Sequence, residues 1–206
     1  MSDSAYLLVI TVPILLVSVS LHEMMHAFTS DWLGDDTARL MGRVSLNPLR
    51  HVDPFLTLAL PLLLILAHLP PFGAAKPVQV NFHRVRYGEY GAAIIGAAGP
   101  LTNLFLALLG IFLLKGLNPV PGVFYDILGY TIIINLGLGI FNSIPWPPLD
   151  GSRVLYAFAP RPLQEIMEGI ERMGMMGLVV FMLLFYQFIG PLVGNLIDKL
   201  TNGLLT

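Results

Sequence analysis

The feature that most constrains this chain is a set of long runs that contain almost no charge. Four runs are long enough to cross a lipid bilayer, which takes roughly 20 apolar residues. They cover residues 5–29, 92–114, 127–145 and 174–197. Charged residues make up only 12% of the 206-residue chain, whereas a soluble domain has about a quarter. The sequence therefore predicts an all-α membrane protein with about four transmembrane helices.

We expect residues 1–206 to form a single integral-membrane domain, with its core at 5–156 and an extra C-terminal helix at 174–197. The first residues lack the basic segment of a signal peptide, so the first run is expected to be retained as a span. The formal net charge is −2 and no basic tail or stripe is present, which argues against a nucleic-acid partner.

Shorter segments lie between the runs. The apolar segment 55–69 has only 15 residues and contains Pro61, so it fits a re-entrant or interfacial segment better than a full span. Segments 42–47 and 75–82 are predicted to form short β-strands. The first is ended by an Asn-Pro pair, and the second shows the alternation of apolar and polar residues that is typical of a strand. Both strands are expected on the cytoplasmic side.

Basic residues are gathered in segments that we expect on one side of the membrane. They are Arg39, Arg43, Arg50, Lys76, Arg84, Arg86, Arg153, Arg161 and Arg172. The N-terminus and the 115–126 loop together carry only Lys115. The positive-inside rule places the larger group in the cytoplasm, which requires the 55–69 segment to enter and return without crossing. The sequence thus predicts a multi-pass protein of the cell membrane.

An ionisable motif interrupts the first apolar run. His22, Glu23 and His26 form H-E-x-x-H. On a helix, positions i and i+4 share a face, so both imidazoles can point at one metal ion with Glu23 beside it. A charged group at the bilayer centre costs about 2.5 kcal/mol or more, so such groups are functional candidates by default. The alternative is that the histidines form hydrogen bonds between helices.

Two histidines do not complete a catalytic zinc site, which takes three protein ligands and a water. The chain has no cysteine, so the third ligand must be His, Asp or Glu. The candidate is Asp150, which follows a proline-rich segment just past the cytoplasmic end of the 127–145 run. Alternating spans bring Asp150 to the membrane half that holds His22 and His26. An Asp-Gly pair after prolines is equally typical of a turn or a helix cap.

Together these motifs resemble the site-2 protease family of intramembrane zinc metalloproteases. The family's H-E-x-x-H reads "HEMMHA" here, and its G-P-x-x-N reads "GPLTN" at 99–103. Its Asn followed by a proline-rich segment and L-D-G reads "NSIPWPPLDG" at 142–151. The segments "GRVSLNPLRHVDP" and "PFGAAKPVQVN" resemble the compact branch, which lacks a PDZ or CBS domain. One departure is the Met24-Met25 pair, where many members have a small residue before the second histidine.

The resemblance implies one zinc ion per chain, held by His22, His26 and Asp150, with Glu23 as the general base. It also implies that Asn103 and Asn142 position substrate or donate to an oxyanion, although their residue type alone favours hydrogen bonding between helices. His51 is expected near the cytoplasmic mouth, where it orients a ligand or substrate, or caps a turn. Gly96, Gly99 and Pro100 are expected to let the 92–114 helix approach the first span closely.

The expected activity is hydrolysis of a peptide bond within or near the transmembrane helix of a membrane protein. Zinc would lower the pKa of a bound water towards ~7, and Glu23 would take its proton and pass it to the leaving amine. A helical substrate must unwind locally, and an exposed strand edge at 42–47, which includes Val44, would hold it extended by β-addition. The expected partners are the lipid bilayer and single-pass or small membrane proteins.

Three other functions fit parts of the sequence, and each fits it less well. A prenyl-protein protease shares H-E-x-x-H but takes a glutamate as third ligand, and no later glutamate here lies in a second motif of that kind. A catalytically silent pseudoprotease would bind membrane partners without cutting them, but it has no use for Glu23. A transporter is disfavoured because the chain shows no repeated half.

Overall fold

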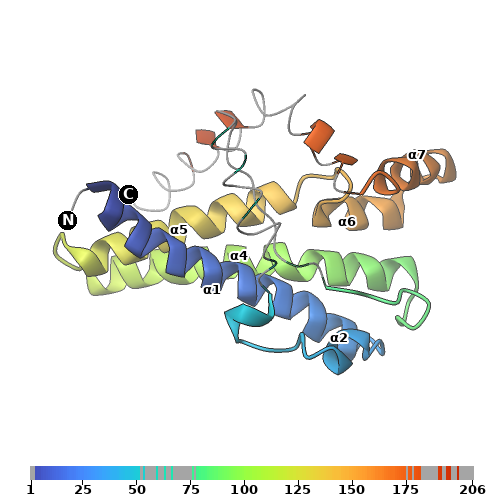
Figure 1. Ribbon diagram of the computed structural model, residues 1–206, viewed down its shortest axis with the longest axis horizontal. Helices are drawn as coiled ribbons and strands as arrows, with labels where there is room; N and C mark the ends of the chain where they lie inside the picture. The colour runs from blue at the N-terminus through green and yellow to red at the C-terminus, as the bar shows by residue number, and fades with distance from the viewer. Residues whose placement is uncertain are drawn as a thin grey trace.

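The computed structural model describes residues 3–51, 76 and 78–174, together with isolated residues between 53 and 66 and between 176 and 199. Three long helices dominate the described part of the chain: α1 (Asp3–Trp32), α4 (Glu89–Leu117) and α5 (Val123–Asn142). They lie side by side, with α4 antiparallel to α1 and α5 (Figure 1). The short helices α2 (Thr37–Leu40), α6 (Asp150–Phe158) and α7 (Arg161–Glu171) gather at the end of the bundle opposite the N-terminus.

The three long helices are apolar enough and long enough to cross a membrane. The stretches Ala5–Trp32, Glu89–Leu117 and Val123–Asn142 have mean hydropathies of 2.1, 2.0 and 1.6. At 1.5 Å per residue even α5 is about 30 Å long, which matches the hydrocarbon core of a bilayer. Three of the four predicted spans are therefore supported. The fourth, 174–197, and the predicted re-entrant segment 55–69 lie mostly outside the described residues, so the count of four is not supported.

Helices α4 and α5 pack closely because small residues lie at their contact. Ala107, Ile111, Ile132 and Leu136 form one buried cluster between them. A Cβ on Gly110 would lie 2.9 Å from Ile132 Cγ1, which is closer than side chains normally pack. Because lipid tails are as apolar as these side chains, close van der Waals packing must hold the helix pair together.

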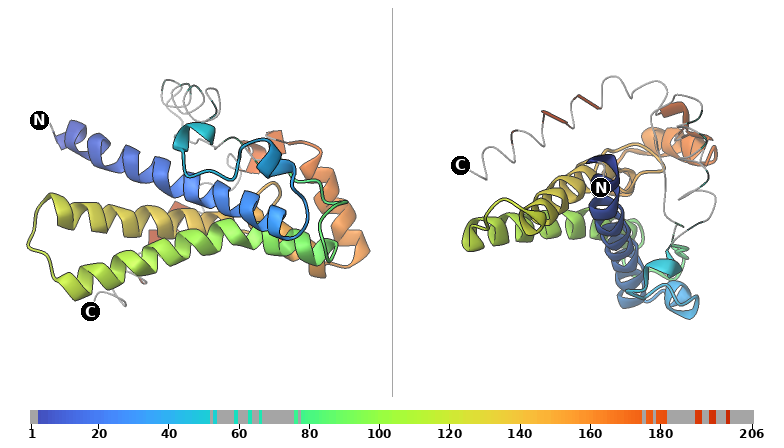
Figure 2. Two further views of the ribbon diagram at one scale, coloured as in Figure 1. Left: turned by 90° about the horizontal axis from the view of Figure 1, so that it is seen from below. Right: turned by 60° about the vertical axis from the view of Figure 1, so that its left-hand side comes forward.

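The connection after α1 is organised around the carboxylate of Asp35, which is fully buried. Its two oxygens accept hydrogen bonds from the backbone and hydroxyl of Thr37, from the hydroxyl of Ser30 and from the amide of Asn81. The amide of Arg86 donates to Leu33 O at 2.9 Å. These bonds hold the end of α1 against the segment that precedes α4, so both lie at the same end of the bundle (Figure 2).

The predicted β-strands at 42–47 and 75–82 were wrong, since the described residues of both segments form turns and loops. Gly42 has φ +69°, outside the range of a strand, and a tight turn follows in which Ser45 N donates to Arg43 O. The Asn47 side chain accepts from Leu49 N and begins the short helix η1 (Pro48–Arg50), which contacts α1. Local turns thus satisfy the backbone that a strand would have needed to pair.

Helices α6 and α7 are joined to each other by polar side chains. Arg153 pairs with Glu171, and Tyr156 Oη donates to Glu168 at 2.7 Å. Helix α6 also packs against α4, where a Cβ on Gly96 would lie 2.8 Å from Arg153 Cβ. Gly96 therefore allows close approach of α6, and not of the first span as the sequence analysis expected.

The Asp35 network predicts an acid-sensitive contribution to stability. Burial raises the pKa of the Asp35 carboxyl, but the hydrogen bonds from Thr37, Asn81 and Ser30 outweigh it and lower the pKa below its usual value. The carboxylate therefore stabilises the fold fully above about pH 4 and loses this effect as the pH falls through the folded pKa. We expect Asp35→Asn to cost about 1–3 kcal/mol at neutral pH, measured as a lower thermal midpoint in detergent.

The matched control is Asp36→Asn, because Asp36 forms part-exposed ion pairs with Arg39 and Arg84. Such pairs contribute about 0–1 kcal/mol. The difference between wild type and Asp35→Asn should shrink below about pH 4. A gap that stays constant down to pH 2 would contradict this account of Asp35.

Candidate metal centre

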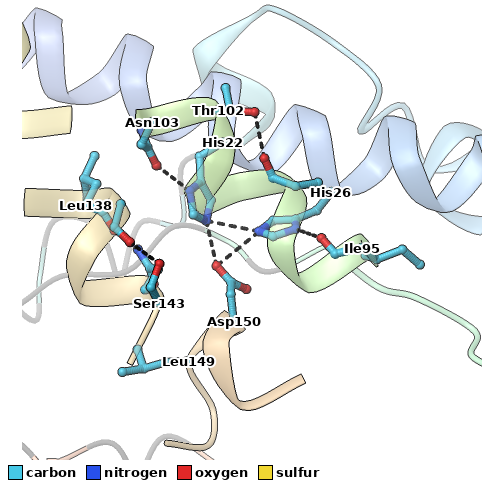
Figure 3. Close-up of polar contacts among 12 residues, drawn as sticks. His22, His26, Ile95, Thr102, Asn103, Leu138, Ser143, Leu149 and Asp150 are labelled. Carbon is cyan, nitrogen blue, oxygen red and sulfur yellow. Dashed lines mark hydrogen bonds and ion pairs between the residues drawn. The ribbon is translucent and has the colours of Figure 1, made fainter. Parts of the chain in front are cut away.

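His22 and His26 lie one turn apart on α1 and present their imidazoles on the same face, towards α4. Both side chains are buried, and their Nε2 atoms are 3.1 Å apart. Figure 3 shows the two rings converging on a single point between α1, α4 and the start of α6. The i, i+4 spacing of a helix is the direct cause of this arrangement.

Asp150 completes the cluster from the first residue of α6. Its Oδ2 lies 3.0 Å from His22 Nε2 and 3.3 Å from His26 Nε2. The turn that delivers it needs Gly151, because a Cβ there would lie 2.2 Å from the carbonyl oxygen of Ser143. Burial raises the pKa of the Asp150 carboxyl, but His26 and His22 outweigh burial and hold this pKa well below its usual range. Asp150 is therefore a carboxylate.

The hydrogen bonds of the two imidazoles use their Nδ1 atoms and leave Nε2 to face the cluster. His26 Nδ1 lies 2.7 Å from Ile95 O, and because a carbonyl can only accept, this nitrogen carries the proton. His22 Nδ1 lies 2.6 Å from Asn103 Oδ1. In the neutral rings both Nε2 lone pairs then face each other and the carboxylate. Metal-bound histidines characteristically use the other ring nitrogen in this way, to a carbonyl or similar acceptor.

The separations of the three ligand atoms also fit zinc. Two nitrogens and one oxygen at 3.0–3.3 Å from one another lie close to the roughly 3.3 Å expected between ligands of a tetrahedral zinc ion. Two imidazole nitrogens and a carboxylate oxygen at these separations form a donor set that a cation between them would stabilise. Among the described residues, His22, His26 and Asp150 form a group of metal-ligating side chains that could hold a metal ion.

Gly99 of α4 provides the space that the cluster occupies. A Cβ at this position would lie 2.4 Å from His26 Nε2 and 2.5 Å from His22 Nε2. Any other residue at this position would therefore displace the ligand atoms. This agrees with the expectation that Gly99 allows α4 to approach the first span, since the imidazoles next to Gly99 belong to α1.

The other predicted site residues lie in different surroundings. Glu23 is half-buried beside the two histidines and makes no hydrogen bond or ion pair with any described residue. Asn103 is fully buried and bonded to His22, whereas the Asn142 amide donates to Leu138 O at 2.9 Å on its own helix. His51 is buried and donates from Nε2 to Ser45 O at 2.8 Å, and Val44 lies partly exposed in the same loop.

Two residues near the site were missed by sequence reasoning. Asn135 of α5 and Ser18 of α1 are both buried and hydrogen-bonded to each other, and Asn135 is also bonded to Asn103. The sequence feature that could have identified Asn135 is its position in the middle of the 127–145 apolar run. A polar group at that depth requires an explanation, as the histidines of the first run did.

Known proteins similar to this chain share one kind of name. This chain is 36% identical over 190 residues to "Putative zinc metalloprotease YwhC" of Bacillus subtilis, and the match covers 87% of this chain and 81% of that protein. It is 31% identical over 170 residues to "Putative zinc metalloprotease Rip2" of Mycolicibacterium smegmatis, covering 82% of this chain and 64% of that protein. No family model matches the chain, and no solved structure matches it significantly.

A more distant relative carries the same description. "Putative zinc metalloprotease SA1105" of Staphylococcus aureus is 31% identical over 125 residues, covering 53% of this chain and 28% of that protein. Zinc is thus the metal named for all three relatives, and the ligand geometry described above could hold that ion.

The clearance at Gly99 predicts a specific loss of metal. We expect Gly99→Ala to weaken zinc binding by about 100-fold, the upper end of what disturbed ligand orientation costs. The control is Gly116→Ala on the same helix, where a Cβ would meet nothing within 4 Å. Zinc content per chain, measured after dialysis against a weak chelator, should fall in the first variant alone. Equal zinc content in both variants would contradict the role of Gly99.

Proposed function

This chain belongs to the site-2 protease family of zinc metalloproteases, and on that premise we propose that it cleaves a peptide bond within or near the transmembrane helix of a membrane protein. One observation carries the proposal. His22 and His26 lie within a helix long and apolar enough to span a membrane, and Asp150 meets them there. A metal site at this depth is suited to substrates that are themselves in the membrane.

The proposed topology is a multi-pass protein whose site opens towards the cytoplasm, in one domain of residues 1–206 with its core at 5–156. The antiparallel arrangement of α4 against α1 and α5 supports it, since the end of α1, the start of α4 and α6 lie together. The short helices at that end carry Arg39, Arg153 and Arg161, whereas Lys115 lies in the last turn of α4. The positive-inside rule assigns the basic end to the cytoplasm.

Bound zinc supplies a Lewis acid that lowers the pKa of a water towards ~7 and polarises the substrate carbonyl. His22, His26 and Asp150 would hold the ion through Nε2, Nε2 and Oδ2. Glu23 would accept the proton of the attacking water and deliver it to the nitrogen of the leaving amine. Its position supports this role, because Glu23 directly follows His22 on α1 and is half-buried beside the ligands.

Asn142 and His51 are proposed to act on the substrate and not on the metal, since neither hydrogen-bonds to the three ligands in the described structure. Asn142 ends α5, directly before the turn that leads to Asp150. Asn103 is instead proposed to hold His22, because its oxygen is bonded to that ring. Val44 has no role in this proposal, since its segment does not form the strand edge that the role required.

An apolar hollow beside Asp150 is the proposed place for the substrate. Its volume is about 480 Å³, and it lies between α4, the turn after α5 and α6. Ala97 and Leu101 line it from α4, and Val154 and Phe158 line it from α6. Gly151 and Pro100, the neighbours of Asp150 and Gly99, also line it, so the hollow lies next to the metal centre. Its apolar lining suits a segment of a transmembrane helix.

Two variants separate binding of zinc from catalysis. We expect Asp150→Ala to lose most of its zinc and all turnover, because it removes one of three ligands. We expect Glu23→Gln to keep about one zinc per chain and to lose at least ~100-fold in turnover, because general-base catalysis contributes about 10²–10⁴-fold. The measurements are zinc per purified chain and cleavage of labelled single-span membrane proteins in detergent.

The outcomes distinguish the proposals. Full turnover by Glu23→Gln would remove Glu23 as the base, and undiminished zinc in Asp150→Ala would move the third ligand elsewhere. A wild type that binds zinc but cuts none of a broad panel of membrane proteins would favour a silent pseudoprotease.

The hollow predicts a matched pair of substitutions on α4. Leu101 lines the hollow and is 61% exposed, whereas Leu108, two turns further along, does not line it and is 54% exposed. We expect Leu101→Trp to slow cleavage of a single-span substrate by at least ~10-fold with zinc retained, because the larger ring fills the space the substrate needs. Leu108→Trp should cleave at the wild-type rate. Equal rates for the two variants would place the substrate elsewhere.

A further inference from the structure

A chain of buried polar side chains extends from the metal centre to α5, and two of its three members, Ser18 and Asn135, lie outside the motifs that the family resemblance covers. Ser18 of α1, Asn103 of α4 and Asn135 of α5 are no more than 3% exposed, and they lie among apolar residues of three spans. Asn135 Nδ2 donates to Ser18 Oγ at 2.9 Å, and Asn135 Oδ1 accepts from Asn103 Nδ2 at 2.8 Å. Asn103 Oδ1 then accepts from His22 Nδ1 at 2.6 Å.

We propose that Asn135 is a positioning residue for the metal centre, which fixes the orientation of the Asn103 amide and through it the ligand atom that His22 presents. The proposal rests on the metal site of the proposed function. Asn135 itself contacts none of the three ligands among the hydrogen bonds of the described residues, so its effect must pass through Asn103.

The orientation follows from an acceptor that cannot change its role. Asn135 Nδ2 also lies 2.9 Å from the backbone carbonyl of Thr131, and a carbonyl only accepts. The Asn135 side chain must therefore turn its NH₂ group towards Thr131 and its oxygen towards Asn103. That oxygen in turn requires the NH₂ group of Asn103, which leaves the Asn103 oxygen for His22.

The last step reaches the metal centre. Because Asn103 presents an oxygen, His22 must carry its proton on Nδ1, and its Nε2 lone pair then faces Asp150 and His26. If the Asn103 amide were reversed, its NH₂ group would favour the other tautomer of His22, whose Nε2 carries a proton and cannot bind a metal. Asn103 Nδ2 has a second acceptor, Ser18 O, but at 3.4 Å this contact is long and holds the amide weakly.

A purely structural explanation is that these groups only connect the three helices. That role would make Asn135 affect stability with or without Asn103 and would leave zinc affinity unchanged in the folded protein. The positioning role differs in one measurable respect. The effect of Asn135 on zinc affinity should disappear when Asn103 is removed, because the two act in series.

The experiment is a double-mutant cycle on zinc affinity in the full chain in detergent. Zinc dissociation constants are measured by competition with a chelating dye for wild type, Asn135→Leu, Asn103→Ala and the double variant. Leucine has the same branching and the same number of side-chain heavy atoms as asparagine, so it is the apolar residue that matches its shape best. We expect Asn103→Ala to weaken zinc binding by 10–100-fold and Asn135→Leu by about 10-fold, as loss of outer-shell partners does. The double variant should be no weaker than Asn103→Ala alone.

Two controls keep the result interpretable. Thr131→Val lies one turn from Asn135 on the same helix and loses only a hydroxyl that donates to Ile127 O, so its zinc affinity should equal that of wild type. Ser18→Ala removes an acceptor of Asn135 with a smaller change of volume, and should show a weaker effect of the same sign if Asn135→Leu fails to fold. The thermal midpoint of each zinc-free variant reports folding separately from metal binding.

The outcomes separate this inference from the proposed function. Equal losses of zinc affinity from Asn135→Leu with and without Asn103 would show that Asn135 does not act through Asn103, and would overturn the inference. An unchanged zinc affinity in Asn135→Leu, with binding still lost in Asp150→Ala, would also overturn it while the metal site stands. Zinc binding that survives both His22→Ala and Asp150→Ala would overturn the metal site itself.

Discussion

The arrangement of this protein depends on the pairing of the polar side chains that are buried among its long apolar helices. A polar group in a hydrocarbon environment must find its partner within the protein, because an unpaired one costs several kcal/mol. The described centre obeys this rule closely: His26 bonds the backbone of Ile95, His22 bonds Asn103, and Asn103 bonds Asn135. Each bond joins two different helices. The polar groups that form the site therefore also fix how α1, α4 and α5 lie against one another.

Close approach of backbones is the second requirement, and glycine provides it at three contacts around the centre. Gly99 leaves room for the two imidazoles, Gly151 lets the turn carrying Asp150 close against Ser143, and Gly96 lets α6 lie on α4. The ligand atoms lie 3.0–3.3 Å apart because these three surfaces meet without side chains between them. Packing and ligand geometry are therefore one constraint: a methyl group at any of the three positions changes both.

Hydrophobic runs and helical periodicity were enough to predict three of the spans and the shared face of His22 and His26. Topology and the charge of the connecting segments brought Asp150 to the same end of the bundle, and the structure places it there. The strands at 42–47 and 75–82 were mispredicted because alternation over a few residues cannot show whether a partner strand exists. The partners of Asn103 could not be predicted, since residue spacing does not show which of several buried amides meet across helices. Asn135 was missed for the same reason.

The depth of the centre constrains how a substrate reaches it. At 1.5 Å per residue, His26 and His22 lie about 9 and 15 Å from the end of α1 at Trp32. Asp150, in contrast, begins the short helix α6 that follows α5, so the ligands come from inside the bundle and from its end. On the proposed function, a substrate helix must then deliver its peptide bond near the end of its own span, where fewer of its hydrogen bonds need to break.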